Sequence, residues 1–300
     1  MKLWYRHRFH TVLAHRIVFA AIPLLPRFLH PPIALVTAFV FFSILRSERR
    51  AVAANLRRVS GARGARLGWK VYRVFYSFCD LIVSYCYIPR ASHAQLLSML
   101  AGTDRGEAKI ERCLAAGNGV IMWTAHLGNP EFASRLLEMH GRTVYVARVV
   151  EDIPAEAMLR DLMGSERLRI VDLSAGVPAA LELMRALRGN QIVAIQGDRL
   201  YQRFAAGLPF FSENAKFPLG PFLLSQASGA PVLPGFVVRE SWLRYRVLLG
   251  EPIPPAPAAG GEADLRARLE TAVRFLERAL TTYHDQWLNF FEFWEASAHE

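Results

Sequence analysis

A histidine directly follows an apolar run that has the length of a buried strand. The run GVIMWTA covers residues 119–125, His126 comes next, and Glu131 follows five positions later, just inside an expected helix. Asn129 suits the N-cap of that helix and Pro130 its first turn. His126 is therefore expected at the carboxyl end of a strand, where open α/β sheets place their sites.

A neutral imidazole at such a position can accept a proton from an attacking hydroxyl group. A carboxylate on the other ring nitrogen fixes the tautomer and raises the basicity, so Glu131 is a candidate partner for His126. The alternative is structural: Glu131 complements the helix dipole and His126 caps a turn. No GxSxG motif accompanies the pair. Its absence favours direct attack by an acceptor hydroxyl over a covalent acyl-enzyme.

Two further segments place polar residues at expected element ends. Asp198 and Arg199 follow the apolar run QIVAIQG. Arg199 could bind a phosphate bidentately, or the two residues could only form an ion pair that closes the sheet edge. In AKFPLGP, Lys216, Phe217 and Gly220 lie at a turn before a helix whose first amides could bind an anion, and a plain turn is the alternative.

Strands and helices alternate in the pattern from about residue 107 onward. Strand patterns cover 119–125, 143–150, 169–173, 191–198, 231–240 and 242–253, and helical patterns cover 107–117, 130–141, 154–164, 177–189, 221–229 and 262–291. This alternation predicts an α/β fold with a mixed, largely parallel sheet flanked by helices. Residues 46–90 have helical spacing of apolar residues. Residues 199–221 are expected to form a loop long enough to carry function.

The positive charge is concentrated at the amino terminus. Residues 1–70 hold thirteen lysines and arginines against one acid, Glu48, whereas the remaining chain holds twenty-three against twenty-five acids. Two apolar runs, 17–29 and 33–45, interrupt these basic residues, and each is shorter than the roughly 20 residues that span a bilayer. Such a segment could lie in the membrane interface, form a short spanning or re-entrant helix, or pack as a buried hairpin on the core. We therefore expect a membrane-associating segment over 1–45 and a single α/β domain over 46–300.

Other classes of partner have weaker support in the sequence. A pI near 9.9 suggests nucleic acid, but the apolar runs between the arginines suit lipid better than a DNA groove, and no zinc-finger or RNP-like motif is present. The three cysteines form no CxxC pair, which favours a reducing compartment. No carboxylate and histidine cluster has the spacing of a metal site. No metal or nucleic-acid partner is therefore expected.

In their order along the chain, these segments resemble the four motif blocks of the lysophospholipid acyltransferase superfamily. HLGNPE resembles its H-x4-D/E block, GDR the second block, FPLGP the third, and GAPVLPGF the fourth. The resemblance is closer to the bacterial lipid A biosynthesis acyltransferases of the lauroyl and myristoyl type, whose first block commonly reads HxGNWE. VAANLRRV, the Tyr-x-Arg of residues 145–148 and the carboxyl-terminal YHDQWLNFFEFWE are also similar to that branch. FPLGP lacks the acid that is usual in the third block.

The resemblance implies transfer of a fatty acyl chain from an acyl thioester to a hydroxyl or amine of a membrane lipid or glycolipid, such as a lipid A precursor. It makes His126 the general base and Glu131 the residue that orients it. Arg148, Arg199 and Lys216 would hold phosphates of the donor or acceptor, in a substrate site that also includes Asp198, Phe217 and Gly220. The donor would be an acyl carrier protein or coenzyme A thioester, and no other cofactor is implied.

The expected location is the cytoplasmic face of a bacterial inner membrane, reached peripherally or through one short amino-terminal segment. Positive charge on a segment that is not translocated favours that face. Two other functions stay open from the residues: hydrolysis of acyl thioesters or lysolipids, with water in place of the acceptor, and membrane binding without catalysis.

Overall fold

Six strands form one mixed sheet, as the alternating pattern predicted. The computed structural model describes residues 22–102, 106–149, 166–200 and 204–298. The strand order is β3-β2-β4-β1-β7-β8, with parallel pairs except for β7 and β8. The strands are β1 (Val120–Thr124), β2 (Val144–Arg148), β3 (Leu168–Asp172), β4 (Ile192–Gln196), β7 (Val232–Ser241) and β8 (Arg244–Leu249). The carboxyl ends of the five parallel strands therefore meet at one edge of the sheet.

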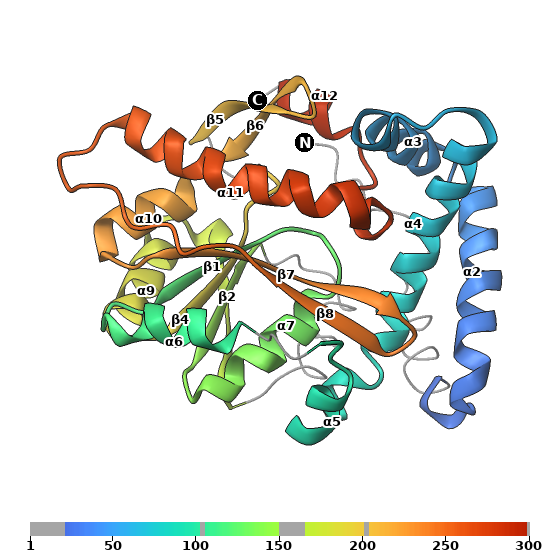
Figure 1. Ribbon diagram of the computed structural model, residues 1–300, viewed down its shortest axis with the longest axis horizontal. Coiled ribbons are helices and arrows are strands. Elements are labelled where there is room, and N and C mark those ends of the chain that lie inside the picture. Colours follow the sequence, from blue (N-terminus) through green and yellow to red (C-terminus); the bar gives the residue numbers. More distant parts are fainter. Residues whose placement is uncertain (1–21, 103–105, 150–165, 201–203, 299–300) are drawn as a thin grey trace.

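Helices cover both faces of this sheet (Figure 1). On one face lie α6 (Glu107–Ala115) and α7 (Pro130–Leu137), and on the other α9 (Val177–Arg188), α10 (Gly220–Ser228) and α11 (Glu262–Tyr283). Successive residues of a strand point to opposite faces. In β1, Met122 accordingly packs toward α6, whereas Ile121 and Trp123 belong to the core under α11. The expected helix over 154–164 lies outside the described residues.

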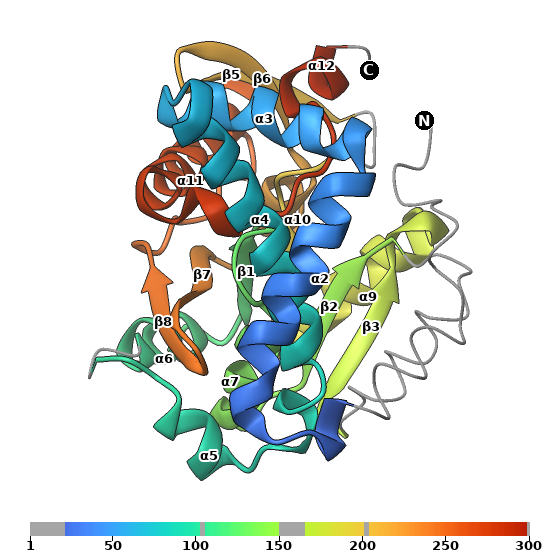
Figure 2. The ribbon, with the colours of Figure 1, turned by 90° about the vertical axis from the view of Figure 1, so that its right-hand side faces the viewer.

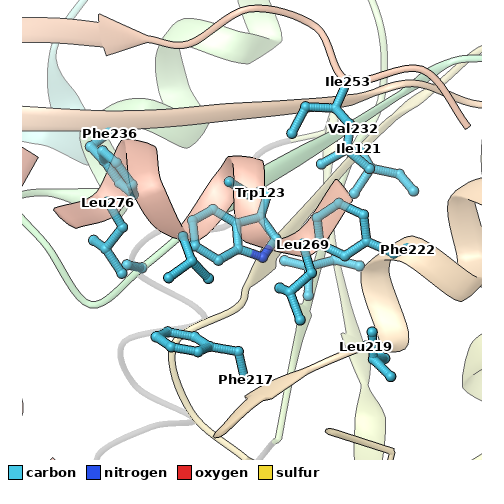
Figure 3. Packing of buried hydrophobic residues seen from close by; sticks show 14 of the residues in the cluster. Ile121, Trp123, Phe217, Leu219, Phe222, Val232, Phe236, Ile253, Leu269 and Leu276 are labelled. Atoms are coloured by element: carbon cyan, nitrogen blue, oxygen red, sulfur yellow. The ribbon is translucent and has the colours of Figure 1, made fainter. Parts of the chain in front are cut away.

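The core under α11 is built around the side chain of Trp123 (Figure 3). Phe217, Phe222 and Leu269 are fully buried in the same cluster. Gly197, which follows β4, allows the indole to come close, since a Cβ there would lie 1.9 Å from the Trp123 ring nitrogen. A side chain at this position would displace the indole or the chain that follows β4.

Three helices at the amino terminus pack beside the sheet. They are α2 (His30–Ile44), α3 (Arg46–Ser60) and α4 (Gly64–Ser84), preceded by η1 (Ile22–Leu24) and η2 (Arg27–Leu29). The small residues Ala34 and Ala38 of α2 are buried in a cluster with side chains of α4, and α2 lies along the outer side of α4 (Figure 2). Within the described residues, no single helix combines the length and apolar character of a membrane span. Only α2 and α3 together meet both criteria, and a 98° bend separates them. The described part of the expected amino-terminal segment, residues 22–45, therefore forms η1, η2 and α2, and α2 packs on α4.

The structure departs from the predicted elements in two places. The expected loop over 199–221 contains a hairpin of β5 (Ala205–Phe210) and β6 (Glu213–Pro218). The expected helix over 262–291 ends early, because α11 stops at Tyr283 and the chain continues through η6 (His284–Gln286) into extended backbone. The shorter elements are η3 (Ile88–Arg90), α5 (His93–Ser98), η4 (Glu138–His140), η5 (Leu173–Ala175) and α12 (Phe293–Ala298).

Candidate active site

The loop between β1 and α7 carries His126 in a fixed backbone path. Asn129 is the N-cap of α7, as predicted, and its Oδ1 accepts a hydrogen bond from the amide of Phe132 at 2.9 Å. Gly128 has a φ of +74°, and a Cβ there would lie 2.0 Å from the carbonyl oxygen of Val237. The loop therefore requires glycine at this position both for its backbone angle and for its close approach to β7.

Asp198, rather than Glu131, is the carboxylate that contacts His126. The Nδ1 atom of His126 lies 2.7 Å from Asp198 Oδ1, and the His126 amide lies 3.1 Å from each carboxylate oxygen. Asp198 is 1% exposed, so its carboxylate is shielded from water, whereas the His126 side chain is 17% exposed. With an ionised Asp198, Nδ1 keeps its proton and donates a hydrogen bond to the carboxylate, which leaves Nε2 as the basic nitrogen.

The strand register explains why these two residues meet. Thr124 of β1 pairs with Gln196 of β4. His126 and Asp198 each lie two positions beyond that pair, so they leave neighbouring parallel strands side by side. Both residues were predicted at strand ends, but Asp198 was predicted to bind substrate. The adjacency of β1 and β4 was the missing information.

The pKa values of both members of the pair are lowered, from different dominant causes. Burial lowers the pKa of the His126 imidazole below its usual 6.5, and the nearby charge of Arg199 lowers it further, while Asp198 opposes both effects. Burial would raise the pKa of Asp198, but His126, Arg199 and the hydrogen bond from Trp287 outweigh it, so the net shift is downward. At neutral pH the site therefore holds a neutral imidazole beside an ionised carboxylate.

Glu131 belongs to a different polar group, on the cavity side of α7. It shares a hydrogen bond with the hydroxyl of Tyr85, and Arg148 at the end of β2 contributes an opposite charge nearby. Burial raises the pKa of the Glu131 carboxyl, and the Tyr85 hydrogen bond and Arg148 offset only part of that rise. The expected contact between Glu131 and His126 is thus replaced, since the first turn of α7 directs Glu131 toward Tyr85.

An apolar cavity of about 460 Å³ lies between the sheet and helices α6 and α7. Its walls include Met122, Val146 and Ala194 from three adjacent strands, which point to the same face. The polar group of Tyr85, Glu131 and Arg148 also lines this cavity, at the carboxyl edge of the sheet. His126 is not one of the described lining residues, but Thr124 and Pro130, on either side of its loop, are. The volume is typical of ligand pockets of small molecules.

Arg199 lies next to the pair but is held by the carboxyl-terminal segment. Its Nε donates to Asn289 Oδ1 at 2.8 Å, its Nη2 donates to the carbonyl oxygen of Leu288 at 3.0 Å, and its guanidinium lies over the ring of Phe291. These contacts make Arg199 a structural neighbour of the dyad whose charge acts on His126. Its predicted phosphate contact stays a prediction.

The structure places the other predicted substrate residues away from the cavity. Lys216 and Phe217 lie on β6, and Gly220 begins α10. Phe217 is fully buried against Phe210 and Phe293, which is a packing position. None of the three is among the described cavity-lining residues. A proline-glycine turn before a helix occurs in packing and binding sites alike, so the motif alone could not separate these roles.

Three polar residues from distant segments were not predicted: Tyr85 contacts Glu131, and Trp287 and Asn289 contact Asp198. Tyr85 follows α4, and Trp287 and Asn289 follow η6. The signal was present in the segment YHDQWLNFF, where polar residues interrupt a strongly apolar sequence. In the described residues, no group of three or more histidine, cysteine or acidic side chains is arranged to hold a metal ion.

The fold and the site together define an α/β protein with a histidine–aspartate dyad at the carboxyl edge of a largely parallel sheet, beside an apolar cavity. The chain belongs to the bacterial lipid A biosynthesis acyltransferase family, whose sequence pattern matches residues 5–294. This match covers the cavity, the dyad and nearly the whole chain, and it confirms the family that the motif blocks resembled.

Two curated relatives are named as acyltransferases. Both are phosphatidylinositol mannoside acyltransferases from strains of Mycobacterium tuberculosis, each 28% identical to this protein over 149 residues. The match covers 49% of this chain and 47% of each relative, so the chain spans about half the length of the curated relatives it matches. The comparisons therefore show the family to which this chain belongs.

Proposed function

We propose that this protein transfers a fatty acyl chain from an acyl thioester to a hydroxyl or amine of a membrane lipid or glycolipid, such as a lipid A precursor. The observation that carries the proposal is the His126–Asp198 dyad on a loop that borders the apolar cavity. A neutral histidine base beside a space for a hydrocarbon chain suits acyl transfer without a covalent enzyme intermediate.

In the proposed reaction, Nε2 of His126 takes the proton from the acceptor hydroxyl as its oxygen attacks the thioester carbonyl. Asp198 holds the imidazole through Nδ1 and stabilises the imidazolium that forms. Collapse of the tetrahedral intermediate breaks the carbon–sulfur bond, and the imidazolium returns the proton to the leaving thiolate. One ester bond replaces one thioester bond, and the base is regenerated.

The cavity is proposed to hold the acyl chain of the donor. Chain burial there would remove hydrocarbon from water at about 25 cal/mol per Å², and would place the thioester at the polar end of the cavity, near the His126 loop. Arg148 lines this end, so it is the predicted substrate residue that the geometry supports best. The thiol carrier would be an acyl carrier protein or coenzyme A.

We also propose that the protein docks on a lipid bilayer through the outer face of α2. Leu35, Val36, Phe39, Val40 and Ile44 are exposed, at positions that repeat every three or four residues and so form one stripe. A contiguous apolar surface of this kind marks an interaction site.

The charges and position of α2 fit an anionic membrane as the occupant of that stripe. Arg46 and Arg50, in the first turns of α3 after the end of α2, are exposed, and basic side chains favour anionic headgroups. At the other end of the helix, His30 packs against Tyr87, two residues from Tyr85 in the cavity wall. The cytoplasmic face of the inner membrane is the proposed location, because a thioester donor is made in the cytoplasm and the acceptor is a lipid.

The first test is acyl transfer by purified protein in detergent. Wild type and His126→Ala would be incubated with a radiolabelled acyl-carrier-protein or coenzyme A thioester and a total lipid extract of the host. We expect wild type alone to make a labelled lipid, whose isolation identifies the acceptor. Label released only as free fatty acid by a His126-dependent reaction would favour a hydrolase. Donor left intact by both proteins would contradict catalysis and leave membrane binding as the function.

A further inference from the structure

Residues 286–289, here named the carboxyl-terminal strap, run directly against the loop that carries His126. The carbonyl oxygen of Gln286 accepts a hydrogen bond from the Gly128 amide at 3.1 Å. The amide of Leu288 donates to the carbonyl oxygen of His126 at 2.8 Å, and Leu127 and Trp287 form an antiparallel bridge between them. The strap therefore pairs with the His126 loop as a short strand would.

Two side chains of the strap bind the carboxylate of the dyad. Trp287 Nε1 donates to Asp198 Oδ2 at 3.0 Å, and Asn289 Nδ2 donates to the same oxygen at 3.1 Å. The other oxygen, Oδ1, is the one at 2.7 Å from His126 Nδ1. The two carboxylate oxygens thus have different side-chain partners: Oδ2 accepts from the strap, and Oδ1 accepts from the imidazole.

The strap is itself anchored on both sides. The side-chain amide of Gln286 accepts from the Arg239 amide and donates to the Arg239 carbonyl oxygen, both at 2.7 Å. Asn55 of α3 donates to the carbonyl oxygen of Asn289 at 3.2 Å. Asn289 Oδ1 accepts from Arg199, so one buried amide links Arg199 to Asp198. Such a network is rigid only when its donors and acceptors are matched, as these are.

We propose that Trp287 and Asn289 are positioning residues that hold the Asp198 carboxylate in the orientation in which it accepts the hydrogen bond from His126. The inference rests on the proposed role of His126 as the base. Without the strap donors, the carboxylate could rotate about its Cβ–Cγ bond and its charge would be less well compensated. The polar residues of the motif QWLN thereby act on the reaction through Asp198, without touching substrate.

Loss of a hydrogen-bond donor from the strap should shift the pKa of His126 in a predictable direction. A carboxylate with fewer hydrogen bonds has a higher proton affinity, and it accepts more strongly from the imidazole. The imidazolium form of His126 is then stabilised, so the pKa of His126 rises. A merely structural role in packing would change melting temperature and leave this value in place.

The test compares wild type with Trp287→Phe and Asn289→Asp in the full-length protein. Trp287→Phe keeps an aromatic ring and removes the N–H. Asn289→Asp keeps the shape and the acceptor for Arg199, but puts a carboxylate where Asp198 had a donor. Trp294→Phe is the matched control, because Trp294 belongs to the same aromatic cluster and packs on Phe210 and Phe293. NMR titration of 13C-labelled histidine would give the pKa of His126, assigned by loss of its signal in His126→Ala.

We expect the His126 pKa to rise by roughly half a unit in Trp287→Phe and by more in Asn289→Asp, with no shift in Trp294→Phe. In transfer assays, kcat should fall about tenfold in Asn289→Asp while KM for the donor stays constant. If both folded variants titrate His126 within about 0.1 unit of wild type, the proposal is wrong. Should Asn289→Asp fail to fold, Trp287→Phe alone carries the test. The titration needs no turnover, so an inactive wild type would count against the proposed function while the titration still decides the role of the strap.

Discussion

Two carboxyl groups near His126 have opposite environments, and these environments separate their roles. Asp198 accepts hydrogen bonds from the His126 ring and amide and from two strap side chains, which favours its ionised form. Glu131 is shielded beside Tyr85, and the pKa of its carboxyl is raised by burial. Its Oε2 atom is sealed from solvent with no hydrogen-bond partner in the described residues. When the environments of two acids shift their pKa values in opposite directions, the acid that stays ionised is the charge partner of the base.

These different environments predict that substitution of the two acids lowers kcat by different factors. Asp198→Asn removes the charge partner and favours the wrong tautomer of His126, so we expect kcat to fall by roughly 10³-fold, as in His126→Ala. Glu131→Gln keeps the shape and the hydrogen-bonding capacity toward Tyr85, and we expect a loss below about tenfold. Steady-state rates with saturating donor would measure both. Equal losses in Asp198→Asn and Glu131→Gln would restore Glu131 as the orienting acid.

The pH dependence of turnover follows from the pKa of His126. Only the neutral imidazole can accept a proton, so activity falls on the acid side as the ring becomes protonated. Because burial and Arg199 lower this pKa below 6.5, the acid limb of kcat/KM should lie below pH 6.5 and the rate should be flat through neutral pH. A profile of kcat/KM between pH 5 and 8 measures it. A limb centred above pH 6.5 would show that Asp198 dominates the shift.

At the scale of elements, the sequence was sufficient for the strands of the sheet but not for their order. All six strands of the sheet and the Asn129–Pro130 helix start were predicted, because each depends on local periodicity or capping. The pairing of His126 with Asp198 depends on β1 lying beside β4, 72 residues away in sequence. Local patterns carry no strand order, so the nearer Glu131 was preferred.

The same limit explains the two elements that were not predicted. The β5–β6 hairpin was read as loop, and the strap as the continuation of a helix. Each is stabilised by contacts with a segment distant in sequence: Phe210 stacks on Trp294, and Asn289 donates a hydrogen bond to Asp198. Tertiary contacts of this kind override local propensity, and they become visible only when distant segments are placed together.

Neighbouring strands also offer a test of the cavity. Val146 of β2 and Ala194 of β4 are register partners, and both line the cavity. Ala194→Leu should fill part of the space and reduce kcat/KM for long acyl donors more than for short ones. Val146→Ala should enlarge it and shift the preference toward longer chains. The measurement is kcat/KM across a series of donor chain lengths, and an equal effect on all lengths would argue against this cavity as the chain site.

Across the whole molecule, charge and exposed apolar surface gather at the same end of the chain. The sequence predicted this from the basic residues and the two apolar runs. It could not specify which side chains would be exposed, since that depends on how α2 packs against α4. Ala34 and Ala38 face α4, whereas Val36 and Phe39 face outward, 66% and 63% exposed. Ala34 and Ala38 allow α2 to pack closely on α4, whereas Val36 and Phe39 are available to contact another partner.

Bilayer docking through α2 predicts a loss of membrane binding when that stripe is made acidic. Val36→Asp removes an apolar contact and adds repulsion from anionic headgroups, so partitioning into phosphatidylglycerol vesicles should fall at least about tenfold. Val177→Asp is the matched control, because Val177 is 72% exposed on α9, at the far side of the sheet. Flotation of both variants and wild type with vesicles measures the partitioning, and transfer to a detergent-solubilised acceptor should survive in both. Wild-type binding by Val36→Asp, or an equal loss in Val177→Asp, would show that α2 is not the docking face and that its apolar stripe meets a different partner.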